Sequence, residues 1–200
     1  MRSIKKQIIL LMIGSSAIAA ICLILVFYFQ SSSAAVAAGR LRARTDLDIV
    51  ESILDLRYPG SWTVKKGELY KGKTNLTNYF AAADDIKNLT GNECVIFLKN
   101  ICVSTTVPVG DCDRAVGVYA PYEVTSKVLE VGPQYYTGQA NLSGRFYHTS
   151  YKPIKTDYGE IIGVLYVGVP ALQYDDFVYH PIQMAGLTGL GLIIAAGIGG

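Results

Sequence analysis

Side chains that can bind a small molecule are concentrated in the stretch from Gly144 to Ile154. This stretch alternates in the manner of a β-strand, so its side chains fall into two sets on opposite faces. One set contains Arg145, Tyr147, Thr149 and Tyr151, and the other contains Phe146, His148, Ser150 and Lys152. An arginine can bind a carboxylate through two parallel hydrogen bonds, and tyrosine hydroxyls beside it can orient such a ligand. Only one set can face a pocket, and alternation alone leaves the choice open.

Other candidate binding residues lie on segments that we expect to neighbour this strand. Tyr135 and Tyr136 come shortly before it and can close one side of a pocket. Further candidates on the strands predicted nearby are Thr105, Arg114 and Tyr119. The alternative interpretation is that the aromatic side chains are ordinary sheet residues and that Arg145 is a solvated charge at the sheet edge.

Catalysis, metal binding and nucleic-acid binding are not expected. The chain has two histidines, which are far apart in the sequence, and its basic residues are scattered and matched by acids. It contains no G-x-S-x-G, H-E-x-x-H or P-loop motif, and no G-x-G-x-x-G after a strand. We therefore expect no enzyme, no metal and no cofactor. Three function classes are compared: a ligand sensor, a membrane-anchored structural module, and a hydrolase with an unrecognised carboxylate site.

The cysteines predict at most one disulfide. Cys94, Cys102 and Cys112 lie outside the apolar runs, whereas Cys22 lies within the first of them. Three is an odd number, so one thiol must stay unpaired. We predict a bridge between Cys102 and Cys112, and the alternative is Cys94–Cys102. The spacings match no standard zinc or haem pattern.

Two apolar runs predict membrane crossings at both ends of the chain. The first has its core at 8–29, and a helix over 8–30 is long enough to cross a bilayer. Arg2, Lys5 and Lys6 precede it, which places residues 1–7 in the cytoplasm. The second crossing is predicted at 181–200, so that residues 31–180 lie outside the cytoplasm. A cleaved signal peptide, with small residues at 35–37 as the cleavage site, is the rival interpretation.

Between the two runs, the patterns predict an α+β domain. A long helix is expected at about 34–57, and the sheet domain at about 58–170. The acids of the helix, Asp46, Asp48, Glu51 and Asp55, are interpreted as a solvated face. Shorter helices are predicted from Asn75 or Thr77 to Asn88, and from Pro121 to Glu130. Strands are predicted at 94–98, 101–107, 114–119, 145–154 and 161–169, the last as a buried central strand.

The order of short motifs resembles a known family. DLRYPGSW, LYKG, LTG, VIF and RAVG are followed by YYTGQANLSGRFYHTSYKPI and GEIIGVLYVGVP. This order, between two predicted spans, resembles the single-Cache extracytoplasmic sensor domains of bacterial chemoreceptors and sensor kinases. The likeness covers roughly residues 45–170.

The resemblance implies a PAS-like antiparallel sheet with the long helix on one face and a small-molecule pocket on the other. Applied to this strand, it favours the set with Arg145, Tyr147 and Tyr151 as the pocket face, with Tyr135, Tyr136 and Thr105 nearby. It also implies a small organic anion as the ligand, a homodimer, and a location in the bacterial inner membrane. The function expected is that of a chemotaxis receptor, with a sensor kinase or cyclase-type receptor as the alternative.

Overall fold

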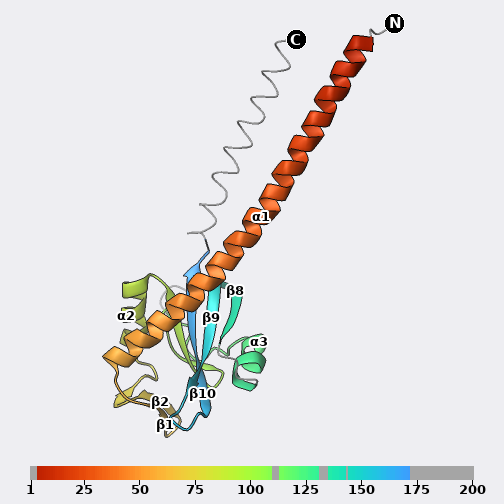
Figure 1. The fold of residues 1–200 in the computed structure, drawn as a ribbon. Coiled ribbons are helices and arrows are strands. Elements are labelled where there is room, and N and C mark those ends of the chain that lie inside the picture. The colour runs from red at the N-terminus through yellow and green to blue at the C-terminus, as the bar shows by residue number, and fades with distance from the viewer. Residues whose placement is uncertain (1–3, 110–112, 131–134, 143, 172–200) are drawn as a thin grey trace. The chain divides into compact units, whose positions relative to one another are not determined.

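A computed structural model describes residues 4–109, 113–130, 135–142 and 144–171 (Figure 1). The chain divides into two compact units, one made of Met1–Ala37 with Leu172–Gly200 and the other of Ala38–Ala171. Helix α1, Ile4–Arg57, contributes to both. The predicted second membrane crossing, at 181–200, lies outside the described residues.

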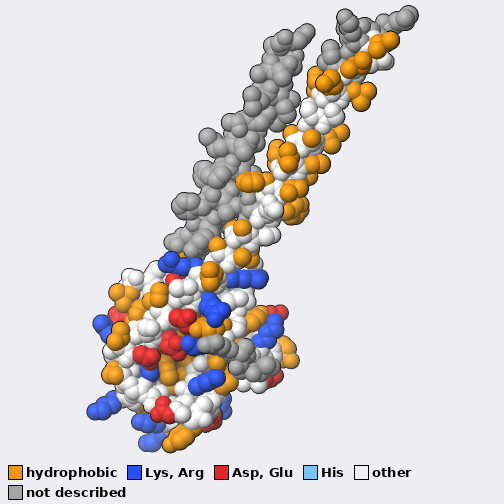
Figure 2. Space-filling model, viewed as in Figure 1, with side chains coloured by type: hydrophobic (Ala, Val, Ile, Leu, Met, Phe, Trp, Pro, Cys, Tyr) orange, Lys and Arg blue, Asp and Glu red, His pale blue; other side chains and the backbone are white. Residues whose placement is uncertain are grey.

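The N-terminal part of α1 has the character of a membrane helix. Its apolar side chains are exposed, with Leu11 at 73%, Leu23 at 70% and Phe29 at 68%. Ser15 and Ser16 donate to helix carbonyls of the preceding turn, so their hydroxyls are satisfied within the helix. Among the described residues, one helix, running from Leu11 to Arg57, is long and apolar enough to cross a membrane. Figure 2 shows apolar side chains along this part of α1, whereas charged side chains gather over the folded domain.

The second unit is built on a five-stranded antiparallel sheet. Its strand order is β5 (Ile101–Thr105), β4 (Glu93–Leu98), β10 (Ile161–Pro170), β9 (Arg145–Lys155) and β8 (Tyr136–Leu142). Strand β10 lies at the centre, and eight of its ten residues are buried. The apolar run was therefore correctly predicted as a central strand. The β9–β10 turn contains Gly159 with φ 81°, a conformation that favours glycine.

Smaller elements surround the sheet. Strands β1 (Trp62–Lys65), β2 (Glu68–Lys71) and β3 (Thr74–Asn75) form a three-stranded sheet, and β6 (Pro108–Val109) pairs with β7 (Asp113–Arg114). Helix α2 spans Phe80–Thr90, and α3, Tyr122–Val124, continues into a π-helix at Thr125–Glu130. These elements make an α+β domain, as predicted.

Two boundaries predicted from the sequence are wrong. Helix α2 begins at Phe80, because Asn75 and Thr77 use their side chains to accept from the backbone N–H groups of Thr77 and Leu69. The strand expected at 114–119 is only two residues long, because a turn with φ 79° at Gly117 interrupts it. Beyond the turn, Tyr119 makes a single bridge to Ile101.

Three of the four acids of α1 contact the sheet domain, so the interpretation as a solvated face is wrong for these three, whereas Asp55 is exposed and pairs with Lys71. Asp46 is only 3% exposed and accepts from the amide of Asn92 at 2.8 Å. Asp48 accepts from Tyr135, and Glu51 accepts from Lys152 of β9. The helical period places these acids beside Ala43, Leu47, Val50 and Leu54, which are also buried. Helix α1 therefore covers one face of the sheet through both apolar and ionic contacts.

Candidate functional site

The face of the sheet opposite α1 carries a row of side chains that crosses all five strands. Register pairs Tyr136 of β8 with Tyr151 of β9, and Tyr151 with Tyr166 of β10. Tyr166 pairs with Val95 of β4, which pairs with Thr105 of β5. Because directly paired residues point to the same face of a sheet, these five residues share one surface.

A cavity of about 200 Å³ lies on this face. Its floor comes from the sheet, and its cover comes from the segments that follow β5 and β7. The residues that line it are Val95, Phe97, Cys102, Thr105, Val107, Ala115, Val118, Tyr119, Pro121, Ala140, Leu142, Tyr151 and Tyr166. The cavity therefore lies where a PAS-like sheet was expected to hold its ligand.

Tyrosines form one wall of the cavity. The rings of Tyr151 and Tyr166 lie 5.0 Å apart, and those of Tyr136 and Tyr151 lie 5.8 Å apart, both in tilted arrangements. Burial raises the pKa of Tyr151 to about 12 and raises the pKa of Tyr166 well above its ordinary value. Both hydroxyls are therefore neutral at physiological pH and can donate or accept a hydrogen bond.

The hydroxyl of Tyr166 has an unusual environment. Tyr166 is 4% exposed, and its hydroxyl oxygen has no hydrogen-bond partner within the described part of the chain. The oxygen occupies the space that a side chain at Gly168 would take. Leaving a buried hydroxyl without a partner is unfavourable, so this atom favours a ligand that can satisfy it.

The predicted site residues occupy four different places. Tyr151 and Thr105 line the cavity. Tyr136 packs against the cluster of buried apolar side chains that includes Tyr151. Tyr147 is buried on the same face, four residues before Tyr151 on β9, but does not line the cavity. Arg145 is exposed at the start of β9.

Tyr135 is directed toward α1 instead. Its hydroxyl donates to Asp48, and its ring lies 4.2 Å from the guanidinium carbon of Arg44. This hydrogen bond to a carboxylate, together with burial, raises the pKa of Tyr135. Tyr135 and Tyr136 are adjacent in sequence, and they point to opposite sides of the sheet.

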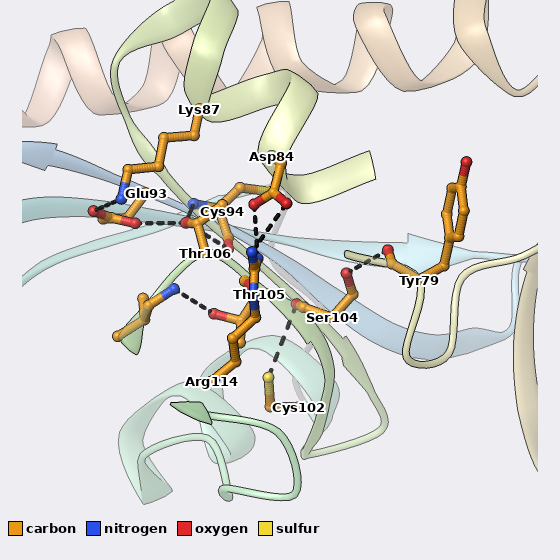
Figure 3. A network of polar contacts seen from close by, with 11 residues as sticks. Tyr79, Asp84, Lys87, Glu93, Cys94, Cys102, Ser104, Thr105, Thr106 and Arg114 are labelled. Atoms are coloured by element: carbon orange, nitrogen blue, oxygen red, sulfur yellow. Dashed lines mark hydrogen bonds and ion pairs between the residues drawn. The ribbon is translucent and has the colours of Figure 1, made fainter. Parts of the chain in front are cut away.

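Arg114, a candidate binding residue in the sequence, holds the cavity cover in place. Figure 3 shows its guanidinium between Asp84 of α2 and the backbone of β5. It donates to both carboxylate oxygens of Asp84, at 2.7 and 3.0 Å, and to the carbonyl of Thr105 at 2.8 Å. It also lies 4.8 Å from the ring centre of Phe80. With these contacts made, Arg114 fixes β7 against α2.

A second polar group beside the cavity floor is already satisfied internally. Glu93 accepts from Lys87 at 2.7 Å and from the hydroxyl of Thr106 at 2.5 Å (Figure 3). Thr105 uses its own hydroxyl to accept from the backbone N–H of Val107 at 3.0 Å. These bonds hold the start of β4 and the end of β5 in place, and they leave neither group free to bind a ligand.

The sequence analysis missed Tyr166 and Phe97 as cavity residues. Both lie in strands that were recognised only as buried and apolar. Pairing the predicted hairpin outward from its turn would not have found Tyr166, because the register shifts between Ile161 and Gly163.

The cysteines leave one prediction standing. Cys94 and Cys102 are not bonded to each other, so the alternative Cys94–Cys102 bridge is not formed. Burial raises the pKa of both, that of Cys102 to about 11. Cys112 lies outside the described residues, so its bridge to Cys102 stays a prediction. Within the described ranges, no cluster of histidine, cysteine and acidic residues could hold a metal ion.

A larger hollow lies away from the sheet face. It has a volume of about 700 Å³ and is bordered by the β1–β2, β4–β5 and β9–β10 turns. Tyr158, on its border, is 99% exposed. None of the predicted site residues lines it.

Comparison with known proteins gives one family match. The model of the family described as single cache domain 3 matches residues 74–180, which is 107 of the 200 residues. Among solved structures, the sensor domain of Escherichia coli DcuS is similar, with 11% sequence identity and a TM-score of 0.38. That similarity covers 48% of this chain and 68% of the other. No curated protein matches the chain.

Proposed function

Because the chain belongs to the single cache domain 3 family, we propose that it is a membrane-anchored receptor that binds a small molecule in the cavity opposite α1. The observation that carries this proposal is the cavity itself, about 200 Å³ on the tyrosine-bearing face of the sheet. A structural module would have no need of a hollow there, because a filled core is more stable than a cavity.

The proposed ligand contacts follow from position. Tyr151 and Thr105 line the cavity, and Tyr136 lies beside them. Tyr147 and Arg145 are nearer the start of β9 and would meet only a ligand that extends beyond the cavity. Tyr135 would act indirectly, through its contact with α1.

Strand β9 offers a short route for the signal. Tyr151 lines the cavity on one face, and the next residue, Lys152, donates to Glu51 of α1 on the other. A shift of β9 on ligand binding would therefore change the ionic contacts of α1 directly. A ligand can drive such a change only through its different affinities for the two states.

We propose that residues 8–30 cross the membrane with residues 1–7 in the cytoplasm, that residues 31–180 lie outside, and that 181–200 cross back. In an inner membrane, α1 would then connect the sensor to the bilayer. Labelling of Lys73→Cys from outside intact cells, in a background with Cys112→Ser, tests this topology. Labelling that appears only after lysis would contradict it.

The finer proposal is a homodimeric chemotaxis receptor, with a sensor kinase or cyclase-type receptor as the alternative output. A chimera that joins residues 1–200 to the signalling region of a chemoreceptor should make cell swimming respond to the ligand. Chemical crosslinking of the receptor in membranes tests whether it is a dimer. A response with a kinase region alone would favour the alternative.

The site proposal is tested by a pair of variants on β8. Ala140 lines the cavity, so Ala140→Phe should fill part of it. Gln139 is exposed and lies on the opposite face, so Gln139→Phe adds the same ring elsewhere. A thermal-shift screen of the full chain in lipid nanodiscs should find compounds that stabilise the wild type and Gln139→Phe. Compounds that stabilise Ala140→Phe equally well would contradict the proposed site.

A further inference from the structure

We propose that the cavity takes an uncharged, largely apolar molecule about the size of one ring, with a single hydrogen-bonding group, rather than an organic anion. This inference rests on the proposed sensing function and names the class of ligand for that site.

The walls of the cavity carry no charge. None of its lining residues within the described part of the chain is lysine, arginine, histidine, aspartate or glutamate. The internal segments outside the description, 110–112, 131–134 and 143, contain no lysine, arginine or histidine either. A carboxylate in an apolar cavity without a cation loses its hydration and gains no compensating partner.

Three cations on neighbouring elements do not line the cavity. Arg114 is bound to both oxygens of Asp84. Lys127 is exposed and lies over the ring of Tyr136, 4.7 Å from its centre. Arg145 is exposed at the start of β9 and does not line the cavity. The arginine on which an anionic ligand was predicted is therefore not placed to bind one there.

The volume restricts the size of the ligand. Drug-sized pockets are usually about 300–1,000 Å³, whereas a dry apolar cavity of about 150 Å³ in another protein binds benzene. The hollow is partly open to solvent, and its volume of about 200 Å³ suits one ring with a short substituent. The rings of Phe97, Tyr151 and Tyr166 provide aromatic and apolar contact for it.

The single hydrogen-bonding group is inferred from Tyr166. Tyr166 lines the cavity, and its hydroxyl oxygen is buried without a hydrogen-bond partner within the described residues, whereas the hydroxyl of Thr105 already accepts from Val107. A neutral hydroxyl on the ligand can either donate to this oxygen or accept from it. The oxygen lies over Gly168, which has no side chain.

Two matched pairs of probes test the class of ligand. Benzyl alcohol is compared with benzoate, and cyclohexylmethanol with cyclohexanecarboxylate, by ligand-observed NMR on the full chain in lipid nanodiscs. Within each pair, size and shape are similar and the charge differs. We expect at least one alcohol to bind the wild type and Gln139→Phe, and each acid to bind more than about tenfold more weakly. Ala140→Phe should lose the binding, which separates the cavity from partition into lipid.

Tyr166→Phe tests the hydrogen bond. The substitution should weaken binding of the alcohol about fivefold. Binding of the corresponding methyl compound, toluene or methylcyclohexane, should be unchanged. An equal loss for both compounds would overturn the role of the hydroxyl.

The outcomes separate this inference from the proposed function. If an acid binds as tightly as its alcohol and Ala140→Phe abolishes that binding, the inference is overturned while the cavity remains a sensor site. If neither alcohol binds, the inference is also overturned. The proposed function would fail instead if compounds found in the screen stabilise Ala140→Phe as much as the wild type.

Discussion

The two faces of β9 differ in how they are held. On the α1 face, Lys152 is bound to Glu51, and the ring of His148 packs directly against Gly39. On the cavity face, Tyr151 packs against other rings and borders a hollow. One strand therefore has a tightly packed side and an incompletely filled side. In such a sheet, a ligand can be bound on the second side while the first side transmits the displacement.

The burial of Tyr151 should appear as a loss of stability at alkaline pH. The pKa of Tyr151 is raised to about 12, from about 10 in the unfolded chain. Below pH 10 both states are protonated, and above it the unfolded state ionises first, so stability falls as the pH rises toward 12. Between these pH values, the free energy of unfolding of the wild type should fall by about 2 kcal/mol more than that of Tyr151→Phe, measured by urea unfolding of the full chain. Equal losses would mean that the cavity wall is open to water.

Close packing on the α1 face predicts that Gly39→Ala destabilises the domain by about 2 kcal/mol. A methyl group at this position would overlap the ring of His148. Alanine otherwise stabilises a helix relative to glycine, so the effect has the opposite sign to helix propensity. Gly14→Ala is the control, because nothing lies within 4 Å of the added carbon.

A rescue experiment identifies the cause. In the Gly39→Ala background, His148→Ala should recover part of the lost stability, as measured in a double-mutant cycle by thermal unfolding. If the two losses simply add, the proposed clash is incorrect.

The ionic part of the same face predicts that Asp46→Ala costs about 1.5 kcal/mol. Asp46 is buried and bonded to Asn92 and Arg42, so the substitution leaves the amide of Asn92 without its acceptor. Glu130→Ala, at an exposed acid, should change the free energy of unfolding by less than about 0.5 kcal/mol. Similar small effects for both variants would restore the interpretation of a solvated helix face.

On the cavity face, Arg114→Ala should lower the free energy of unfolding by about 0.5–1 kcal/mol, less than Asp46→Ala. The effect is smaller because the ion pair of Arg114 with Asp84 is partly exposed. The loss should shrink as the salt concentration rises. Arg145→Ala is the matched control, since Arg145 is exposed at the start of β9. If Arg145→Ala is the more damaging, then Arg114 does not hold the cover.

The same comparison explains how much could be predicted from the sequence. The cavity face could be predicted in part, because strand alternation places Tyr147, Thr149 and Tyr151 together and the central run of β10 is plainly buried. The register could not be derived, so Tyr166 was missed although it lies beside Tyr151.

The α1 face was predicted poorly because acids on a helix usually point to solvent. The partners of Asp46 and Glu51 are Asn92 and Lys152, which lie 46 and 101 residues away in the sequence. Nothing in the local pattern of the helix indicates contacts at such separations. Short covering segments such as the one around Gly117 also depend on the sheet beneath them, which local patterns do not describe.

Fluorine NMR of the full chain labelled with 3-fluorotyrosine tests most directly whether the ligand binds on the cavity face. With each signal assigned by a tyrosine-to-phenylalanine variant, a compound found in the screen should shift Tyr151 and Tyr166. A smaller shift of Tyr135 would report the accompanying change at α1, and the fully exposed Tyr158 should stay unchanged. If Tyr151 and Tyr166 do not respond while Tyr135 or Tyr158 does, the ligand binds elsewhere and the account is contradicted.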